Sequence, residues 1–308
     1  MRMPCRRTPW PLLPLALVLA ATTAARAQDI EPRAYSNAPI GVNFLNGGYA
    51  YTQGSLPTDS SLPITNSHLT TSSAVFGYGH VFELWGQSAK INVVAPYSWL
   101  GGDAVFRGLP IQRSVNGLTD ISVRASVNFL GAPAMDLQEF RNYRQDLILG
   151  ATLAITAPIG QYDSSRLVNL GTNRWSIRPE LGASKAFGPL TIELSAGPTF
   201  FTDNTDFLNG HTRSQEPIVS GQAHAIYDFG SGIWGALDGQ FFTGGSTSVD
   251  GNGNHDLQRN WRLGGTLALP LSPNYSLKFF ASAGVSARTN NNYNLIGILL
   301  QYRWGAGL

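Results

Sequence analysis

Charged and hydrogen-bonding side chains recur at alternate positions along many stretches of this 308-residue chain. Charges that project into a pore would set which ions and solutes pass through it. The same charges could instead pair across neighbouring strands and hold a wall together. Both signs occur, so we expect no strong preference for anions or cations. The candidates for a lumen lining are Lys90, Arg124, Arg178, Glu180, Glu193, His224, Asp238, Arg262, Lys278 and Arg303.

Catalytic chemistry has little support in the residue pattern. A hydrolase built on a barrel would need a serine, a histidine and an orienting polar group at one place. No Gly-x-Ser-x-Gly nucleophile motif is present around any serine. Residues 250–254 (DGNGN) resemble half of a calcium loop but lack its closing glutamate, so a loop tip is the simpler interpretation. We therefore predict a protein that is not an enzyme and that has no cofactor and no metal site.

The elements that would position the polar side chains are β-strands. Residues 121–129 alternate strictly, with Ile, Val, Ala, Val and Phe on one face and Ser, Arg, Ser and Asn on the other. About 12 such segments occur, which predicts an all-β, antiparallel, up-and-down transmembrane β-barrel with its polar face turned inward. The expected strands are residues 42–51, 69–84, 89–99, 121–129, 147–158, 174–184, 190–201, 218–227, 233–242, 260–269, 275–285 and 293–304.

The links between these strands alternate in length. Long links occur at residues 54–67, 100–118, 159–173, 202–216 and 243–258, and short ones at 85–88, 187–189, 229–232 and 270–274. Bacterial barrels have long outer loops and short periplasmic turns, so the alternation favours that topology. Segment 131–145 is long where a short turn is expected, and segment 288–292 is short where a long loop is expected. The first fits either a small amphipathic helix at the periplasmic rim or a miscounted pair of strands.

Large aromatic residues fall near the ends of the expected strands. Their rings favour the boundary between membrane and water, where one edge of the ring stays hydrated. Packing at the edges of a β-sandwich is the alternative explanation. The candidates for the membrane interface are Trp85, Trp99, Trp175, Trp234, Trp261, Tyr302 and Trp304.

The first residues have the pattern of an export signal. Three arginines precede an apolar run at residues 12–20, and residues 25–27 (ARA) form a cleavage site. We expect a signal peptide over residues 1–27, a segment over 28–39 that plugs the lumen or forms a tail, and a barrel over 40–308. Cleavage would remove Cys5 and four of the 21 basic residues, leaving 17 basic against 19 acidic ones. No basic patch indicates nucleic-acid binding.

Six short segments carry a family resemblance: residues 34–45, 95–99, 117–120, 157–163, 169–175 and 244–245. In this order they resemble the outer-membrane family named after the meta-pathway of phenol degradation, over nearly the whole of the expected mature chain. The resemblance implies an outer-membrane barrel associated with transport and, by name, with the breakdown of aromatic compounds. The family supplies no catalytic residues to carry over.

Composition agrees with a membrane barrel and narrows the function. Charged residues make up 13 % of the chain, against about 25 % in soluble domains. We predict a Gram-negative outer-membrane channel for passive passage of small molecules, hydrophobic or aromatic ones included. Its expected partners are outer-membrane lipid and a solute whose identity the sequence leaves open, as it does the oligomeric state. The alternatives are a structural or adhesive barrel whose loops bind a partner, and an exported β-sandwich.

Overall fold

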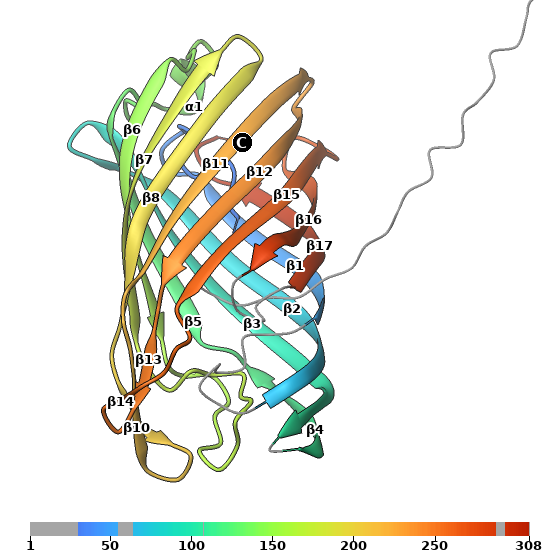
Figure 1. Ribbon diagram of the computed structural model, residues 1–308. Helices are drawn as coiled ribbons and strands as arrows, with labels where there is room; N and C mark the ends of the chain where they lie inside the picture. The colour runs from blue at the N-terminus through green and yellow to red at the C-terminus, as the bar shows by residue number, and fades with distance from the viewer. Residues whose placement is uncertain (1–29, 55–63, 107, 288–292, 308) are drawn as a thin grey trace, which may run out of the picture.

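Alternating apolar and polar residues form long antiparallel strands in the computed structural model, which describes residues 30–54, 64–106, 108–287 and 293–307. Twelve of these strands close into a barrel (Figure 1). They are β1 Asn43–Gly54, β2 Ile64–Leu84, β3 Gln87–Phe106, β5 Ile121–Leu130, β6 Leu147–Ala157, β7 Ser176–Phe187, β8 Leu190–Phe201, β11 Ile218–Gly230, β12 Ile233–Gly244, β15 Gln258–Pro270, β16 Tyr275–Ala287 and β17 Tyr293–Trp304. The predicted signal peptide, residues 1–27, and the predicted short link at 288–292 lie outside the described residues.

Closure leaves none of the twelve strands with an unpaired edge along the ring. The first and last strands, β1 and β17, pair in continuous register from Asn43 with Trp304 to Gly54 with Tyr293. The ring is completed on the other side of β1 by β2, which pairs in turn with β3. Unpaired backbone groups in hydrocarbon cost several kcal/mol each, so a membrane-spanning sheet has to close in this way.

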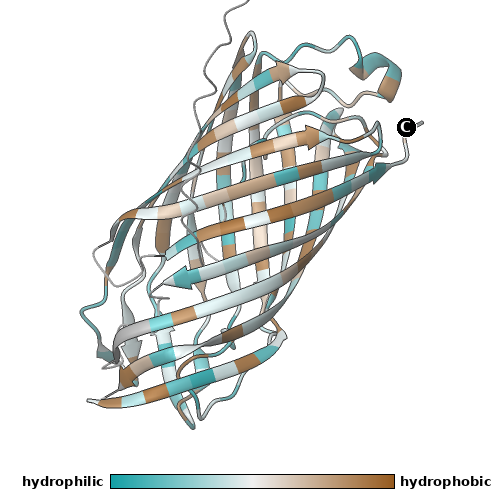
Figure 2. Ribbon diagram, turned by 90° about the vertical axis from the view of Figure 1, so that its right-hand side faces the viewer, coloured by the Kyte–Doolittle hydropathy of each residue, from teal (hydrophilic) through white to brown (hydrophobic). Residues whose placement is uncertain are grey.

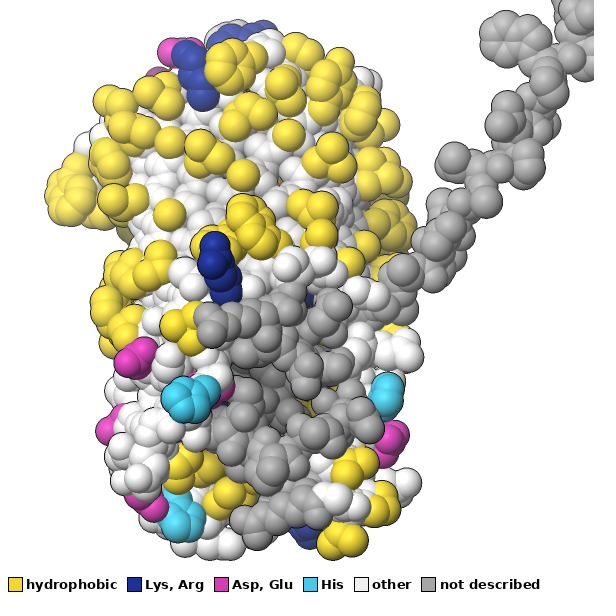
Figure 3. Space-filling view, in the orientation of Figure 1, with side chains coloured by type: hydrophobic (Ala, Val, Ile, Leu, Met, Phe, Trp, Pro, Cys, Tyr) yellow, Lys and Arg dark blue, Asp and Glu magenta, His cyan; other side chains and the backbone are white. Residues whose placement is uncertain are grey.

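The two faces of each strand differ as the sequence predicts. On β11, Ser220, Gln222 and His224 are buried inside, while Val219 and Tyr227 are exposed outside. Figure 2 shows this alternation of hydropathy along the strands. In Figure 3 hydrophobic side chains cover the upper part of the outer surface, and acidic and histidine side chains gather in the lower part. The outer wall is therefore suited to lipid, and the polar residues face inward.

The predicted long links contain strands that the sequence analysis missed. Strand β4, Leu109–Leu118, pairs with the end of β3 that extends past β5. A separate sheet has the order β14-β13-β10-β9, with β9 Asn204–Phe207, β10 His211–Gln215, β13 Thr247–Val249 and β14 Asn252–Gly253. These strands lie at the end of the barrel opposite the C-terminus (Figure 1). We call this end the outer end, because it carries the long links.

The long link at 131–145 contains a short helix, α1 Leu137–Phe140, which settles the choice left open by the sequence. Asp136 caps it by accepting hydrogen bonds from the backbone N–H groups of Gln138 and Glu139, both at 2.8 Å. The Glu139 carboxylate accepts the N–H of Asp136 in return and completes a capping box. The helix lies at the end where the chain terminates (Figure 1). Within the described residues, no helix combines the length and apolarity needed to cross a bilayer.

Candidate functional site

Residues 30–42, called here the N-terminal segment, run through the inside of the barrel before β1 begins. Tyr35 is fully buried and donates its hydroxyl hydrogen to Glu180 on β7, at 2.9 Å. Its ring packs against the backbone at two glycines of the inner wall. A Cβ added to Gly150 or to Gly182 would come within 2.7 Å or 2.0 Å of that ring. The missing side chains on β6 and β7 therefore create the space that Tyr35 occupies.

Charged side chains of the inner wall bind the backbone of this segment. The Glu193 carboxylate on β8 accepts the N–H groups of Ala34 at 3.0 Å and Tyr35 at 3.2 Å. Lys90 on β3 donates to the Ala34 carbonyl oxygen at 2.9 Å. Arg124 on β5 forms an ion pair with Glu31. Of the predicted lumen-lining residues, Lys90, Arg124, Glu180 and Glu193 thus meet around the N-terminal segment.

A second polar cluster lies on β11, β12 and β15. The Nδ1 atom of His224 is 2.7 Å from the Asp238 carboxylate, and both side chains are almost fully buried. The other Asp238 oxygen accepts a hydrogen bond from Thr266 at 3.0 Å. The pair resembles the histidine and carboxylate of a hydrolase, but the Thr266 hydroxyl binds the carboxylate rather than the imidazole. Within the described residues, the cluster is therefore a hydrogen-bonded network in which Asp238 joins His224 to Thr266.

The remaining predicted lining residues have distinct surroundings. Arg262, which is 2 % exposed, donates to the Tyr293 carbonyl oxygen at 2.9 Å and lies over the Tyr293 ring. Arg178 is buried on the inner face of β7. Lys278 is half-buried on the inner face of β16. Arg303 is exposed and donates to the Pro273 carbonyl oxygen, so it lies at the rim rather than along the lumen.

The inner wall has two sectors that differ in packing. The filled sector is the inner face of β8, β11, β12 and β15. Its polar residues Glu193, Gln222, His224, Asp238, Gln240 and Arg262 are each at most 7 % exposed. The open sector is the inner face of β16, β17 and β1. Most of its inward residues stay half-buried, namely Asn46, Gly48, Lys278, Phe280, Leu295 and Leu299. Inward side chains can be reached by solvent only through the lumen, so the open sector borders its accessible space.

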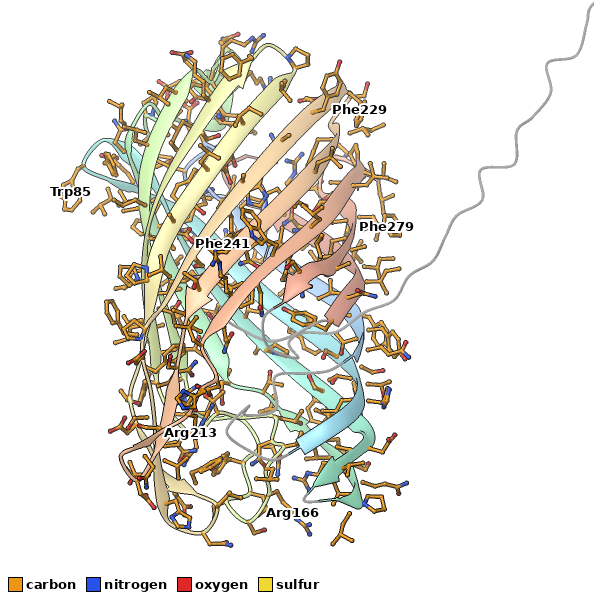
Figure 4. The ribbon with its side chains drawn as sticks, in the orientation of Figure 1. Trp85, Arg166, Arg213, Phe229, Phe241 and Phe279 are labelled. Carbon is orange, nitrogen blue, oxygen red and sulfur yellow. The ribbon has the colours of Figure 1, made fainter. Side chains whose placement is uncertain are left out.

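Most of the predicted interface aromatics are on the outer surface. Trp85, Trp99, Trp175 and Trp261 are between 47 % and 82 % exposed, and Tyr302 stacks on Trp304 with ring centroids 5.3 Å apart. Figure 4 shows Trp85 projecting away from the wall at the β2–β3 turn.

The prediction for Trp234 was wrong. This residue shares the inner face of β12 with Ala236 and Asp238, and the Arg33 guanidinium lies 5.1 Å from its ring centroid. Its position near a strand end suggested the interface, but the alternation of β12 turns it toward the N-terminal segment, where a cation stacks on it.

A loop between β6 and β7 folds over the outer end of the lumen. The Asp120 carboxylate accepts hydrogen bonds from the backbone N–H of Gly160 at 3.0 Å and from the N–H and hydroxyl of Thr172, both at 2.9 Å. Leu170 in this loop packs on the inward residues Leu69 and Leu100. Two of the segments that carry the family resemblance, 117–120 and 169–175, therefore bind each other.

The four-stranded outer sheet has its own polar contacts. The Asp250 carboxylate accepts the N–H of Thr212 at 2.9 Å and lies 2.6 Å from the His211 Nδ1 atom. The Thr212 N–H and then the His211 ring lower the pKa of Asp250. Among the residues that the structure describes, no group of three or more His, Cys, Asp or Glu side chains could hold a metal ion.

Sequence analysis missed Tyr35 and Phe280 as residues inside the barrel. Glycines at inward positions were the available signal, because they mark places where another group approaches the backbone. A Cβ on Gly297 would come within 2.2 Å of the Phe280 ring, just as Gly182 and Gly150 accommodate Tyr35.

Comparisons with known proteins agree with this architecture. Residues 43–303, which span the barrel, match the family described as "Putative MetA-pathway of phenol degradation". The chain is similar to the COG4313 outer membrane channel from Pseudomonas putida F1, with 19 % identity and a TM-score of 0.74 over 90 % of this chain and 100 % of that one. It also matches the transport unit of the autotransporter AIDA-I from Escherichia coli, with 11 % identity and a TM-score of 0.48 over 86 % and 90 % of the two chains. No curated protein sequence matches significantly.

Proposed function

Because the chain belongs to the MetA-pathway phenol-degradation family, we propose that it is a channel that passes small molecules across the bacterial outer membrane. Its solutes include hydrophobic or aromatic molecules, and passage runs down their concentration gradients. The chain is a transport protein and not an enzyme. The solved channel from Pseudomonas putida F1 is a precedent for conduction by this fold.

The observation that carries the proposal is the accessible inner surface of the open sector. Lys278, Phe280 and Leu299 lie on the inner face of a closed wall and still retain solvent-accessible surface. This surface combines aromatic and aliphatic side chains with few charges, which suits solutes that are partly apolar.

The N-terminal segment restricts this path. Glu193, Lys90 and the glycines around Tyr35 attach it to β3, β6, β7 and β8. Its first residues also contact β11, β12 and β15, so the passage that remains lies beside the open sector. A barrel of about 12 strands has a lumen wider than that of an eight-stranded barrel, which side chains fill, and narrower than that of a large porin. One internal segment is therefore enough to narrow this lumen. We expect low conductance rather than a wide aqueous pore.

Reconstitution tests the proposal. Purified protein in planar bilayers should produce discrete ion currents. In liposomes it should accelerate swelling in small aromatic solutes more than in sugars, relative to protein-free liposomes. Folding is checked by the faster migration of unboiled protein in gels. A correctly folded barrel that leaves bilayers sealed to every tested solute would contradict the channel and favour a structural role.

A further inference from the structure

Lys278 is the one charged residue that the described part of the open sector places along the lumen, since Arg303 lies at the rim. Residue pairing places it in a row that runs from Trp234 on β12 through Ala268 on β15 to Lys278, and then to Leu299 on β17. The next row toward the outer end contains Thr266, Phe280 and Gly297. Within the described residues of β16, β17 and β1, the other inward positions are apolar, glycine or uncharged polar, apart from Arg303 at the rim.

The apolar neighbours of Lys278 form a shallow surface beside it. Phe280 is two residues along β16 and points to the same face, about 7 Å away along the strand. Its ring lies over Gly297, where a Cβ would come within 2.2 Å. Leu299 is the direct cross-strand neighbour of Lys278, and Ala268 is the neighbour on the other side. A small ring could therefore lie against Phe280 and Leu299 with one edge at the ammonium group.

The Lys278 ammonium lacks the partners that other inner cations have. Lys90 donates to the Ala34 carbonyl oxygen, and Arg262 donates to the Tyr293 carbonyl oxygen. Asp238 is close enough to interact electrostatically with Lys278, but its two oxygens are already bonded to His224 and Thr266. Across the described parts of the chain, nothing forms a hydrogen bond or ion pair with the Lys278 ammonium. A cation held among apolar side chains is stabilised most by an anion that can also bury an apolar surface.

We propose that Lys278, Phe280 and Leu299 form a binding site for small amphipathic carboxylates, in which the carboxylate pairs with the ammonium and an aromatic or alicyclic ring packs on the two apolar side chains. The site deepens the proposed channel function, on which it rests, by selecting aromatic or alicyclic acids among the solutes. The lumen as a whole is lined by charges of both signs, but this site would give its open sector a local preference for anions.

Binding and current block by benzoate test the site. Benzoate is titrated calorimetrically into folded protein in non-ionic detergent, a measurement that does not require transport. Block of the chloride current is recorded in bilayers at about 0.1 M salt, where screening is moderate. We expect Lys278→Met to weaken both effects at least tenfold and Lys278→Arg to keep them within about threefold, because the arginine still pairs with a carboxylate. Benzamide, which is neutral and similar in shape, should have little effect on the wild type.

Lys185→Met is the matched control. It removes the same group from a rim lysine that pairs with Asp146, and it should leave benzoate binding unchanged. Equal benzoate binding by wild type and Lys278→Met, or none by the wild type, would overturn the site. Conduction by wild type in that case would leave the channel intact. Lys278-dependent binding without any conduction would instead contradict the channel and retain the site.

Discussion

The filled and open sectors of the inner wall belong to one continuous sheet, yet they differ in what their inward side chains do. In the filled sector the charged side chains are buried and have partners. His224 pairs with Asp238, Arg262 donates to the Tyr293 carbonyl oxygen, and Glu193 accepts hydrogen bonds from the N-terminal segment. In the open sector, glycines and apolar residues surround a single lysine and retain accessible surface. The comparison indicates that the polar lining of a barrel is not one continuous solute path. Most of its charge stabilises the interior, and a less polar strip borders the passage.

The largest test of this comparison uses two glycines with similar surroundings. Gly182 lies on β7, next to the filled sector and against the N-terminal segment, and Gly297 lies on β17 in the open sector. Both Gly182 and Gly297 face inward under an aromatic ring, at 2.0 Å and 2.2 Å from an added Cβ. Gly182→Ala should displace Tyr35 and loosen the N-terminal segment, which raises single-channel conductance by a factor of about two or more as the lumen empties. Gly297→Ala should push the Phe280 ring into the open path and lower the conductance. Each change should also cost about 1–3 kcal/mol of stability through overpacking.

Gly101→Ala is the control for this pair, because its added Cβ meets no atom within 4 Å. It should leave conductance and stability unchanged. Conductance changes of the same sign for Gly182→Ala and Gly297→Ala would mean that the wall that holds Tyr35 and the open sector do not play different roles.

A smaller effect is expected from changing Glu193, the buried carboxylate that binds the N-terminal segment. Glu193 is 1 % exposed and accepts two backbone N–H groups of that segment. Glu193→Gln keeps the shape but weakens both bonds and leaves an amide without its full set of partners, at a cost of about 1–3 kcal/mol. Trypsin should then cut after Arg33 about tenfold faster, since cleavage follows the population of the released segment.

The exposed Glu216 is the matched control, and Glu216→Gln should leave the rate of cleavage by trypsin unchanged. Unchanged cleavage in Glu193→Gln would show that the tyrosine site alone holds the segment.

The sequence predicts the barrel well because strand alternation and turn residues are local signals. The twelve predicted strands correspond to the twelve barrel strands, mostly within a few residues at each end. Strands β9, β10, β13 and β14 were missed because they are only two to five residues long. Strand β4 was missed because it lies within a predicted long link, where it pairs with the end of β3. Their pairing depends on contacts between distant loops, such as Asp250 with Thr212, which no local pattern encodes.

The interior is predictable only in part. Alternation identifies the inward face correctly, and for Trp234 it would have corrected the interface prediction, since Trp234 and Asp238 share parity on β12. Which inward charges are bonded, and to what, depends on where residues 30–42 lie. The bond between Tyr35 and Glu180 joins residues 145 positions apart, so the distinction between the two sectors arises only in the folded chain.

The smallest expected effect is a pH dependence of the outer sheet, which belongs to neither sector and serves as a reference for both. The pKa of Asp250 is lowered from its ordinary value of 3.8 by the Thr212 N–H and His211. Its contribution to the outer sheet is therefore complete above the unfolded-state pKa and is lost as the pH falls through the lower folded-state pKa. Amide hydrogen exchange should show protection of residues 211–215 falling as the pH drops below 3.8, while β11 in the filled sector keeps its protection. Asp250→Asn should remove this dependence, whereas Asp206→Asn on the neighbouring strand should preserve it. Loss of protection in β11 over the same pH range would mean that the outer sheet and the filled sector unfold together. The stability of the filled sector would then depend on the outer sheet as well as on contacts inside the lumen.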